Sequence, residues 1–154
     1  MTRSRRLARR LAGSLAAVLL AVTPLAGCSS EQEQYCQAVK DHQKRLTEIM
    51  SDAGPTALLE ALDSFRELRA EAPSDIGDEW QQVIRSIEAL EQALNDAGVD
   101  PEDFSGGKPP EGLSKSEREA IASAADEVGS QATEVALGGV QQQALDVCKT
   151  QLWL

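Results

Sequence analysis

Four side chains stand out as able to do chemistry: the three cysteines, Cys28, Cys36 and Cys148, and a single histidine, His42. A cysteine can form a disulfide, carry a lipid or act as a nucleophile. A single histidine leaves His-pair metal sites and the usual hydrolytic triad without partners. The sequence has no nucleophile elbow, no phosphate-binding glycine loop and no acidic pair that stands apart from the general acidity. We therefore expect a protein that is not an enzyme and that holds no metal or cofactor.

Cys28 follows an N-terminal segment with the charge pattern of an export signal. Residues 1–10 carry five arginines and no acid, and residues 11–27 carry no charge and are rich in Ala and Leu. A permanent transmembrane helix is the alternative, although 17 residues interrupted by Gly13 and Pro24 are at the short limit for a span. The paired arginines leave two export routes open, the general secretory route that we favour and the twin-arginine route.

The last four residues of this segment, Leu25-Ala26-Gly27-Cys28, resemble the lipobox of bacterial lipoproteins. The resemblance implies that residues 1–27 are a signal peptide cut before Cys28. It also implies a thioether-linked diacylglycerol on Cys28 and usually a third acyl chain, such as palmitate, on the new amino group. Two or three chains hold a protein firmly on a membrane, whereas one holds it only marginally. We therefore expect a lipid anchor on the outer face of the cytoplasmic membrane, with residues 28–34 as anchor and short tether.

The other two cysteines are expected to pair with each other. An exported protein folds in an oxidising compartment, and with Cys28 taken by lipid, Cys36 and Cys148 remain. Two free thiols or a redox couple are the alternatives. Redox couples usually lie close together in sequence, whereas these cysteines are 112 positions apart. We predict a structural disulfide that joins the first helix to the last.

Residues 35–154 have the periodicity of a single helical domain. Apolar residues recur at helical spacing, and no strand-like alternation is present. Capping boxes at Ser30 with Glu33 and at Ser114 with Glu117 mark two helix starts, and Gly98 suits a helix end. The predicted helices cover about residues 30–50, 55–72, 74–97, 114–128 and 131–148, with a long Pro- and Gly-rich loop at residues 99–113. We expect an all-α fold, a compact and largely antiparallel bundle of about five helices.

The charge of the expected mature chain argues against negatively charged partners. Residues 28–154 hold 10 Lys and Arg against 25 Asp and Glu, which gives a formal charge of −15. Such a body is repelled by nucleic acid and by anionic lipid headgroups. Within it, the acidic residues from Asp96 to Asp103 are either a calcium-binding loop or a solvated one, and the solvated loop is favoured because the EF-hand pattern is missing.

Several further residues carry two interpretations each. His42 lies on the apolar face of the first helix, either as a pH-sensitive group or as a boundary histidine bonded to a neighbouring helix. Phe104 is either packed on the bundle or offered to a partner, and Trp80 is expected in the core. Gly138-Gly139 is either a bend in the last helix, which we favour, or a point of close approach.

The C-terminal tail is expected to start near the lipid anchor. An extended tether would keep the domain within roughly 25 Å of its lipid. If Cys36 bonds Cys148, both ends of the mature chain share one pole of the bundle. Trp153 then either faces the membrane, where tryptophan is favoured, or folds back onto the bundle with the rest of the tail.

Taken as a whole, the chain resembles small disulfide-containing lipoproteins of actinobacteria, a group without an assigned reaction. The resemblance rests on the lipobox, Tyr35-Cys36, the run from Ala97 to Pro101 and the run from Asp146 to Lys149. We expect a membrane-tethered binding or scaffold module that contacts another envelope protein or a wall polymer. The alternative is a carrier of small apolar ligands, which would require an apolar cavity of a few hundred cubic ångströms.

Overall fold

The computed structural model describes the backbone of residues 26–52, 56–104 and 109–154, and the side chains of these ranges from residue 31 onward. The expected signal peptide therefore lies almost entirely outside the described residues. Within them, the chain forms five α-helices and two short 3-10 helices, and no strand. These are α1 (Ala26–Ser51), α2 (Ala57–Glu71), η1 (Ser74–Ile76), α3 (Gly77–Ala97), η2 (Pro101–Asp103), α4 (Lys115–Val128) and α5 (Gln131–Cys148). The predicted all-α bundle is confirmed.

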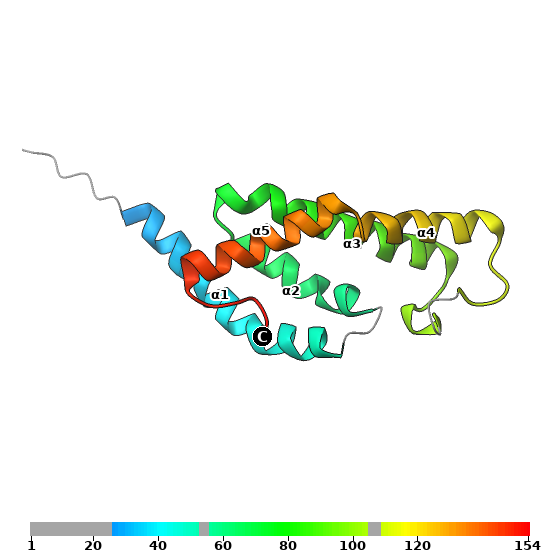
Figure 1. Cartoon of the computed structure of the whole chain (residues 1–154), viewed down its shortest axis with the longest axis horizontal. Coiled ribbons are helices and arrows are strands. Elements are labelled where there is room, and N and C mark those ends of the chain that lie inside the picture. Colours follow the sequence, from blue (N-terminus) through cyan, green and yellow to red (C-terminus); the bar gives the residue numbers. More distant parts are fainter. Residues whose placement is uncertain (1–25, 53–55, 105–108) are drawn as a thin grey trace, which may run out of the picture.

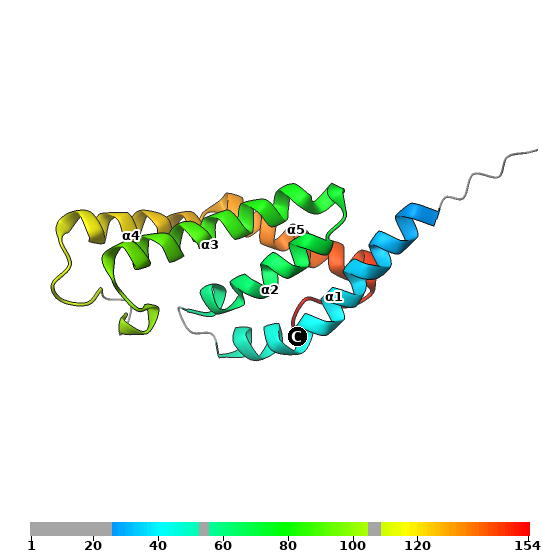
Figure 2. The same ribbon diagram turned by 180° about the vertical axis from the view of Figure 1, so that it is seen from behind.

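Helix α3 is the centre of the arrangement. It packs against α2, α4 and α5, whereas α1 packs mainly against α2 and less extensively against α5. Figure 1 shows α4 and α5 following one another along the length of α3, and Figure 2 shows the same arrangement from behind. The molecule therefore has a four-helix end, formed by α1, α2, α3 and α5, and a thinner end, where α4 accompanies the last turns of α3.

The main hydrophobic core fills the four-helix end. Trp80 of α3 is fully buried, as predicted, and its ring centroid lies 5.7 Å from that of Phe65 on α2. Tyr35 and Val39 of α1 and Val140 of α5 are also fully buried. Aliphatic residues make up most of the remaining core, because the chain has few aromatic side chains. A smaller distal core, with Leu94, Val99 and Ile121 buried, joins α3 to α4 at the thinner end.

Local signals place most of the helix ends. The capping box at the start of α4 is present: Ser114 Oγ accepts a hydrogen bond from Glu117 N–H, and Glu117 Oε2 accepts one from Ser114 N–H at 2.7 Å. Gly98 ends α3 in the left-handed conformation with φ +63°, as its type suggested. Between α4 and α5, Ser130 caps α5 by accepting a hydrogen bond from Thr133 N–H.

The predicted helix start at Ser30 is wrong, because α1 already begins at Ala26. Residues 28–34, expected to be a short tether, therefore continue the helix. At a rise of about 1.5 Å per residue, Cys28 and Cys36 are separated by about 12 Å along the helix axis. That spacing lies within the reach of roughly 25 Å expected for an extended tether.

Gly138-Gly139 does not interrupt α5, which runs without a break from Gln131 to Cys148. The helix therefore does not break at this pair, and the alternative of a close approach describes Gly139. A Cβ atom on Gly139 would lie 3.3 Å from Cγ of Glu79 on α3, so the missing side chain makes room for the neighbouring helix. Among the described residues, no helix is long and apolar enough to cross a membrane.

Candidate functional site

The proximal end of the bundle is defined by the disulfide between α1 and α5. Cys36 and Cys148 are bonded, and their Cα atoms lie 5.1 Å apart. The predicted pairing is confirmed. Because the two residues lie in the first and last helices, the bridge closes the four-helix end across 112 positions of sequence. Cys28, the expected lipid attachment site, precedes this bridge on the same helix.

His42 contacts the neighbouring helix. Its Nε2 lies 3.0 Å from Glu67 Oε2 of α2, and 19% of its side chain is exposed. This is the boundary histidine bonded to a neighbouring helix, one of its two interpretations. The bundle thus uses His42 to join α1 to α2. Nearby, burial raises the pKa of Tyr35, so its phenol stays neutral in the core.

The C-terminal tail folds back along α1. Gln43 of α1 donates from Nε2 to Thr150 Oγ1 at 2.9 Å and to the backbone oxygen of Gln151 at 2.6 Å. Further along, Leu154 N–H donates to Thr47 Oγ1 at 3.1 Å. Leu152 between these contacts is fully buried. The expectation that both ends of the mature chain share one pole is therefore wrong, since the tail runs about 16 Å along α1 from Cys36 to Thr47.

Trp153 follows the rest of the tail onto the bundle. Its ring centroid lies 6.4 Å from that of Phe65 in the main core, and the side chain is partly buried. Of the two arrangements expected for this residue, the structure has the folded-back one. In this arrangement the tail is an extra layer on the four-helix end.

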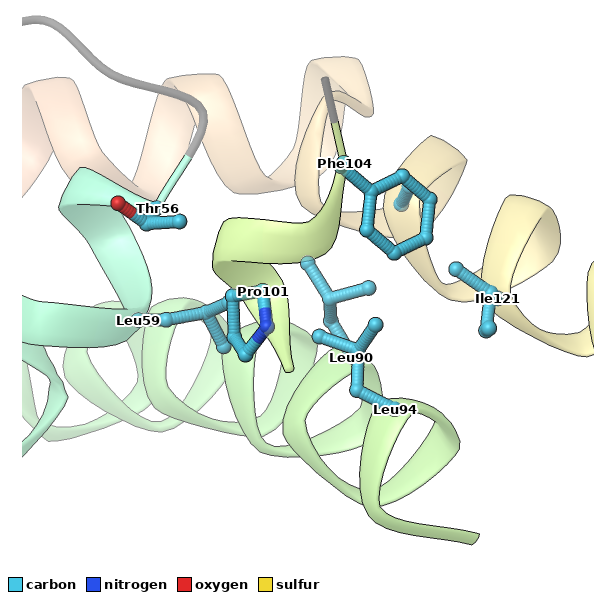
Figure 3. Close-up of a pocket in the computed structure, with 8 residues that line it drawn as sticks. Thr56, Leu59, Leu90, Leu94, Pro101, Phe104 and Ile121 are labelled. Carbon is cyan, nitrogen blue, oxygen red and sulfur yellow. The ribbon is translucent and has the colours of Figure 1, made fainter. Parts of the chain in front are cut away.

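The opposite, distal end of the bundle holds an apolar pocket of about 140 Å³, which we call the distal pocket. Four parts of the chain supply two residues each: Thr56 and Leu59 come from α2 and the residue before it, Leu90 and Leu94 from α3, Pro101 and Phe104 from η2 and the residue after it, and Ile121 and Ala125 from α4. The pairs on α3 and α4 are four residues apart, so each pair lies on one face of its helix. Figure 3 shows these side chains surrounding the hollow.

Phe104 reaches the distal pocket because η2 is held in a tight turn. Phe104 N–H donates to the backbone oxygen of Pro101 at 3.3 Å, and Asp100 N–H donates to Asp103 Oδ2 at 3.3 Å. Asp100 and Asp103, two acids of the predicted acidic segment, thus form part of a hydrogen-bonded turn. Among the described residues, no group of three or more His, Cys, Asp or Glu side chains is placed to hold a metal ion. Phe104 is both packed on the distal core and part of the pocket wall.

One carboxylate is bonded to a wall residue of the distal pocket. Thr56 donates its hydroxyl to Glu60 Oε1 at 2.6 Å, which holds that carboxylate beside the wall. Glu102, Asp103 and Asp126 are exposed and are not among the wall residues. Arg118 of α4 donates its guanidinium to the backbone oxygen of Leu113.

Sequence reasoning identified one wall residue of the distal pocket, Phe104, from its position as an aromatic inside a polar loop. The leucines and Ile121 gave no such signal, because their helical spacing is the same as that of residues in a filled core. The other sizeable hollows in the described part of the chain have more polar walls. One lies at the turn between α2 and α3, beside Arg69, and another between α5 and the tail, beside Leu145.

Comparison of the chain with protein-family models, with curated proteins and with solved structures finds no match.

Proposed function

We propose that the protein is a lipoprotein of the outer face of the cytoplasmic membrane and that it acts as a helical binding module of the cell envelope, with the distal pocket as its recognition site. The leader and the lipobox ending at Cys28 support the anchor. The observation that carries the binding role is an apolar pocket at the end of the bundle furthest from that anchor. The proposal assigns no catalytic residue.

The course of α1 supports an orientation in which the distal pocket points away from the membrane. From Cys28 to Ser51 the helix advances about 35 Å at about 1.5 Å per residue. The chain then returns at Thr56, a wall residue of the distal pocket. A lipid on Cys28 therefore leaves this pocket on the side of the protein that faces away from the membrane. The disulfide makes the base of the bundle rigid, which favours a fixed display of the pocket.

The volume of the pocket favours a protein partner over an acyl-chain carrier. Small-molecule sites usually occupy about 300–1,000 Å³, more than twice the 140 Å³ found here. A cavity of about 150 Å³ in another protein holds one benzene ring. The distal pocket therefore has room for one ring or one branched aliphatic side chain, which is how protein partners commonly anchor in a pocket.

The anchor is tested by metabolic labelling of the full-length chain with radioactive palmitate, followed by membrane fractionation. We expect label and membrane association for the natural sequence, and loss of both for Cys28→Ala. A variant with Cys36→Ser and Cys148→Ser is the matched control, which should keep its label. Label that persists in Cys28→Ala would contradict the anchor.

The binding role is tested by site-specific photocrosslinking in intact cells. A benzophenone amino acid replaces Ala125, at the mouth of the distal pocket, or Ala120, an exposed alanine on another face of α4. We expect a discrete protein adduct from position 125 that is missing from position 120. Equal adducts at both positions, or none at position 125, would refute the distal pocket as the recognition site.

A further inference from the structure

We infer that the groove between α5 and the C-terminal tail binds a neutral sugar unit of an envelope glycan, with Trp153 as the surface on which the sugar ring stacks. This groove, which we call the α5–tail groove, lies between α5, from Gly138 to Leu145, and the tail residues Gln151, Trp153 and Leu154. The inference goes beyond the proposed function, because it assigns a second site with a different class of ligand. It rests on the volume of the groove, on the chemistry of its lining and on the way in which the tail is held.

The volume of the α5–tail groove fits a small ligand. The groove measures about 410 Å³, against about 140 Å³ for the distal pocket. It therefore falls within the range of about 300–1,000 Å³ that small-molecule sites usually occupy. A ring with its substituents can be accommodated here, whereas the distal pocket has room for one apolar side chain.

The polar side chains that line the groove are carboxamides. Gln141 and Gln142 come from α5 and Gln151 from the tail, and none of the described residues that line the groove has a charged side chain. This lining stands out in residues 28–154, which carry a formal charge of −15. A carboxamide both donates and accepts hydrogen bonds, as does a sugar hydroxyl. The lining therefore matches a neutral ligand with several hydroxyls, whereas a charged ligand would lose hydration without meeting an opposite charge.

Trp153 supplies an aromatic surface for the apolar face of a sugar ring. Its ring centroid lies 6.4 Å from that of Phe65, so one part of the indole packs toward the main core while another part borders the groove. Leu145, which is 41% exposed, adds apolar surface on the α5 side. A pyranose ring presents C–H groups on its face and hydroxyls around its edge. The face can pack against the indole while the hydroxyls meet the carboxamides.

The tail side of the groove is held in place by the bundle. Gln43 Nε2 of α1 donates to the backbone oxygen of Gln151 at 2.6 Å. Leu154 N–H donates to Thr47 Oγ1 of α1 at 3.1 Å. These two bonds fix the chain on both sides of Trp153 before a ligand arrives. A site that is already ordered loses less conformational entropy on binding, which favours affinity for a small ligand.

The experiment measures binding of four methyl glycosides to the full-length protein by saturation-transfer NMR and titration calorimetry. The probes are the methyl glycosides of glucose, galactose, mannose and N-acetylglucosamine, and the detergent has no sugar headgroup. We expect saturable binding of at least one probe, with the strongest transfer to the C–H protons of one ring face, because that face lies against Trp153. Glucuronic acid, which has the ring of glucose and a carboxylate, should bind about 10-fold more weakly or not at all.

Variants of the protein localise the binding to the groove. Gly138→Leu fills it and should abolish binding without unfolding the protein, since no atom lies within 4 Å of a Cβ placed there and leucine favours a helix. Ala132→Leu, at an exposed position of α5 outside the groove, should leave binding unchanged. Gln142→Ala should weaken binding about 2- to 10-fold, the equivalent of one hydrogen bond. Gln81→Ala, at an exposed glutamine of α3, is its matched control.

Pull-down on insoluble wall polysaccharide and on beads that carry a glycolipid headgroup distinguishes the two sources of such sugars. Retention on either matrix that is lost in Gly138→Leu and kept in Ala132→Leu supports the inference and identifies the source. Four results would overturn it: no binding of any methyl glycoside, equal binding of glucuronic acid, equal binding to the two leucine variants, or retention on neither matrix. Photocrosslinking at position 125 probes the distal pocket, so failure of this inference and failure of the proposed function are distinguishable.

Discussion

The buried leucine of the C-terminal tail offers a direct test of how the chain ends. Leu152 is fully buried, and hydrogen bonds from Gln43 and to Thr47 hold the residues on either side of it against α1. We predict that Leu152→Ala destabilises the protein strongly. Its neighbour Leu154, which is 79% exposed, is the matched control, since Leu154→Ala removes the same atoms from a site in contact with water.

The size of the effect follows from the burial of the side chain. Leu→Ala in a protein core costs about 2–5 kcal/mol, from lost transfer free energy and from the cavity left behind. A tail at the edge of the bundle can relax into part of the space, so we expect about 2–4 kcal/mol for Leu152→Ala. The exposed control should change the free energy of unfolding by less than about 0.5 kcal/mol.

Urea unfolding followed by circular dichroism, with the disulfide intact, measures both variants. With a slope of about 1.5 kcal/mol per molar urea, the midpoint for Leu152→Ala should fall by roughly 1–3 M. The midpoint for Leu154→Ala should stay near that of the natural chain. If the two variants have the same midpoint, the tail is not packed against the bundle, and the arrangement in which Trp153 faces the membrane returns.

Three other changes should have equally definite results. Reducing the disulfide between Cys36 and Cys148 should lower the free energy of unfolding by about 2–4 kcal/mol because it frees a long loop in the unfolded chain, and urea midpoints with and without reductant measure this. Gly98→Ala should destabilise the protein by about 1 kcal/mol because φ is +63° at this position. Gly138→Ala lies in a helix with open space around it and should stabilise the protein by about 0.5–1 kcal/mol. The melting temperatures of the two variants should therefore shift in opposite directions. The hydrogen bond from Ser114 N–H lowers the pKa of Glu117. The contribution of this carboxylate to stability is therefore present at neutral pH and is lost as the pH falls through the folded-state pKa. Glu117→Gln should flatten the acid side of a plot of unfolding free energy against pH, and an unchanged acid side would contradict this role.

The sequence by itself determined the helices and most of their ends. Helical spacing of apolar residues identified all five α-helices, and Gly98 and Ser114 marked their ends correctly. These signals are readable because each acts within one or two turns of the same helix. Ser30 with Glu33 failed as a start signal, because α1 begins one turn earlier, at Ala26. The disulfide was also predictable, since the expected lipid on Cys28 left only Cys36 and Cys148 to pair.

Only the tertiary structure decided how the remaining features are used. It places Gly139 against Glu79 of α3, it turns the tail back along α1, and it gathers residues of α2, α3, η2 and α4 around the distal pocket. In the sequence, Leu59 and Ile121 are indistinguishable from residues of a filled core. The physical reason is that a pocket, a contact between helices or a packed tail depends on side chains far apart in the chain, and their meeting is set by the packing of the whole bundle.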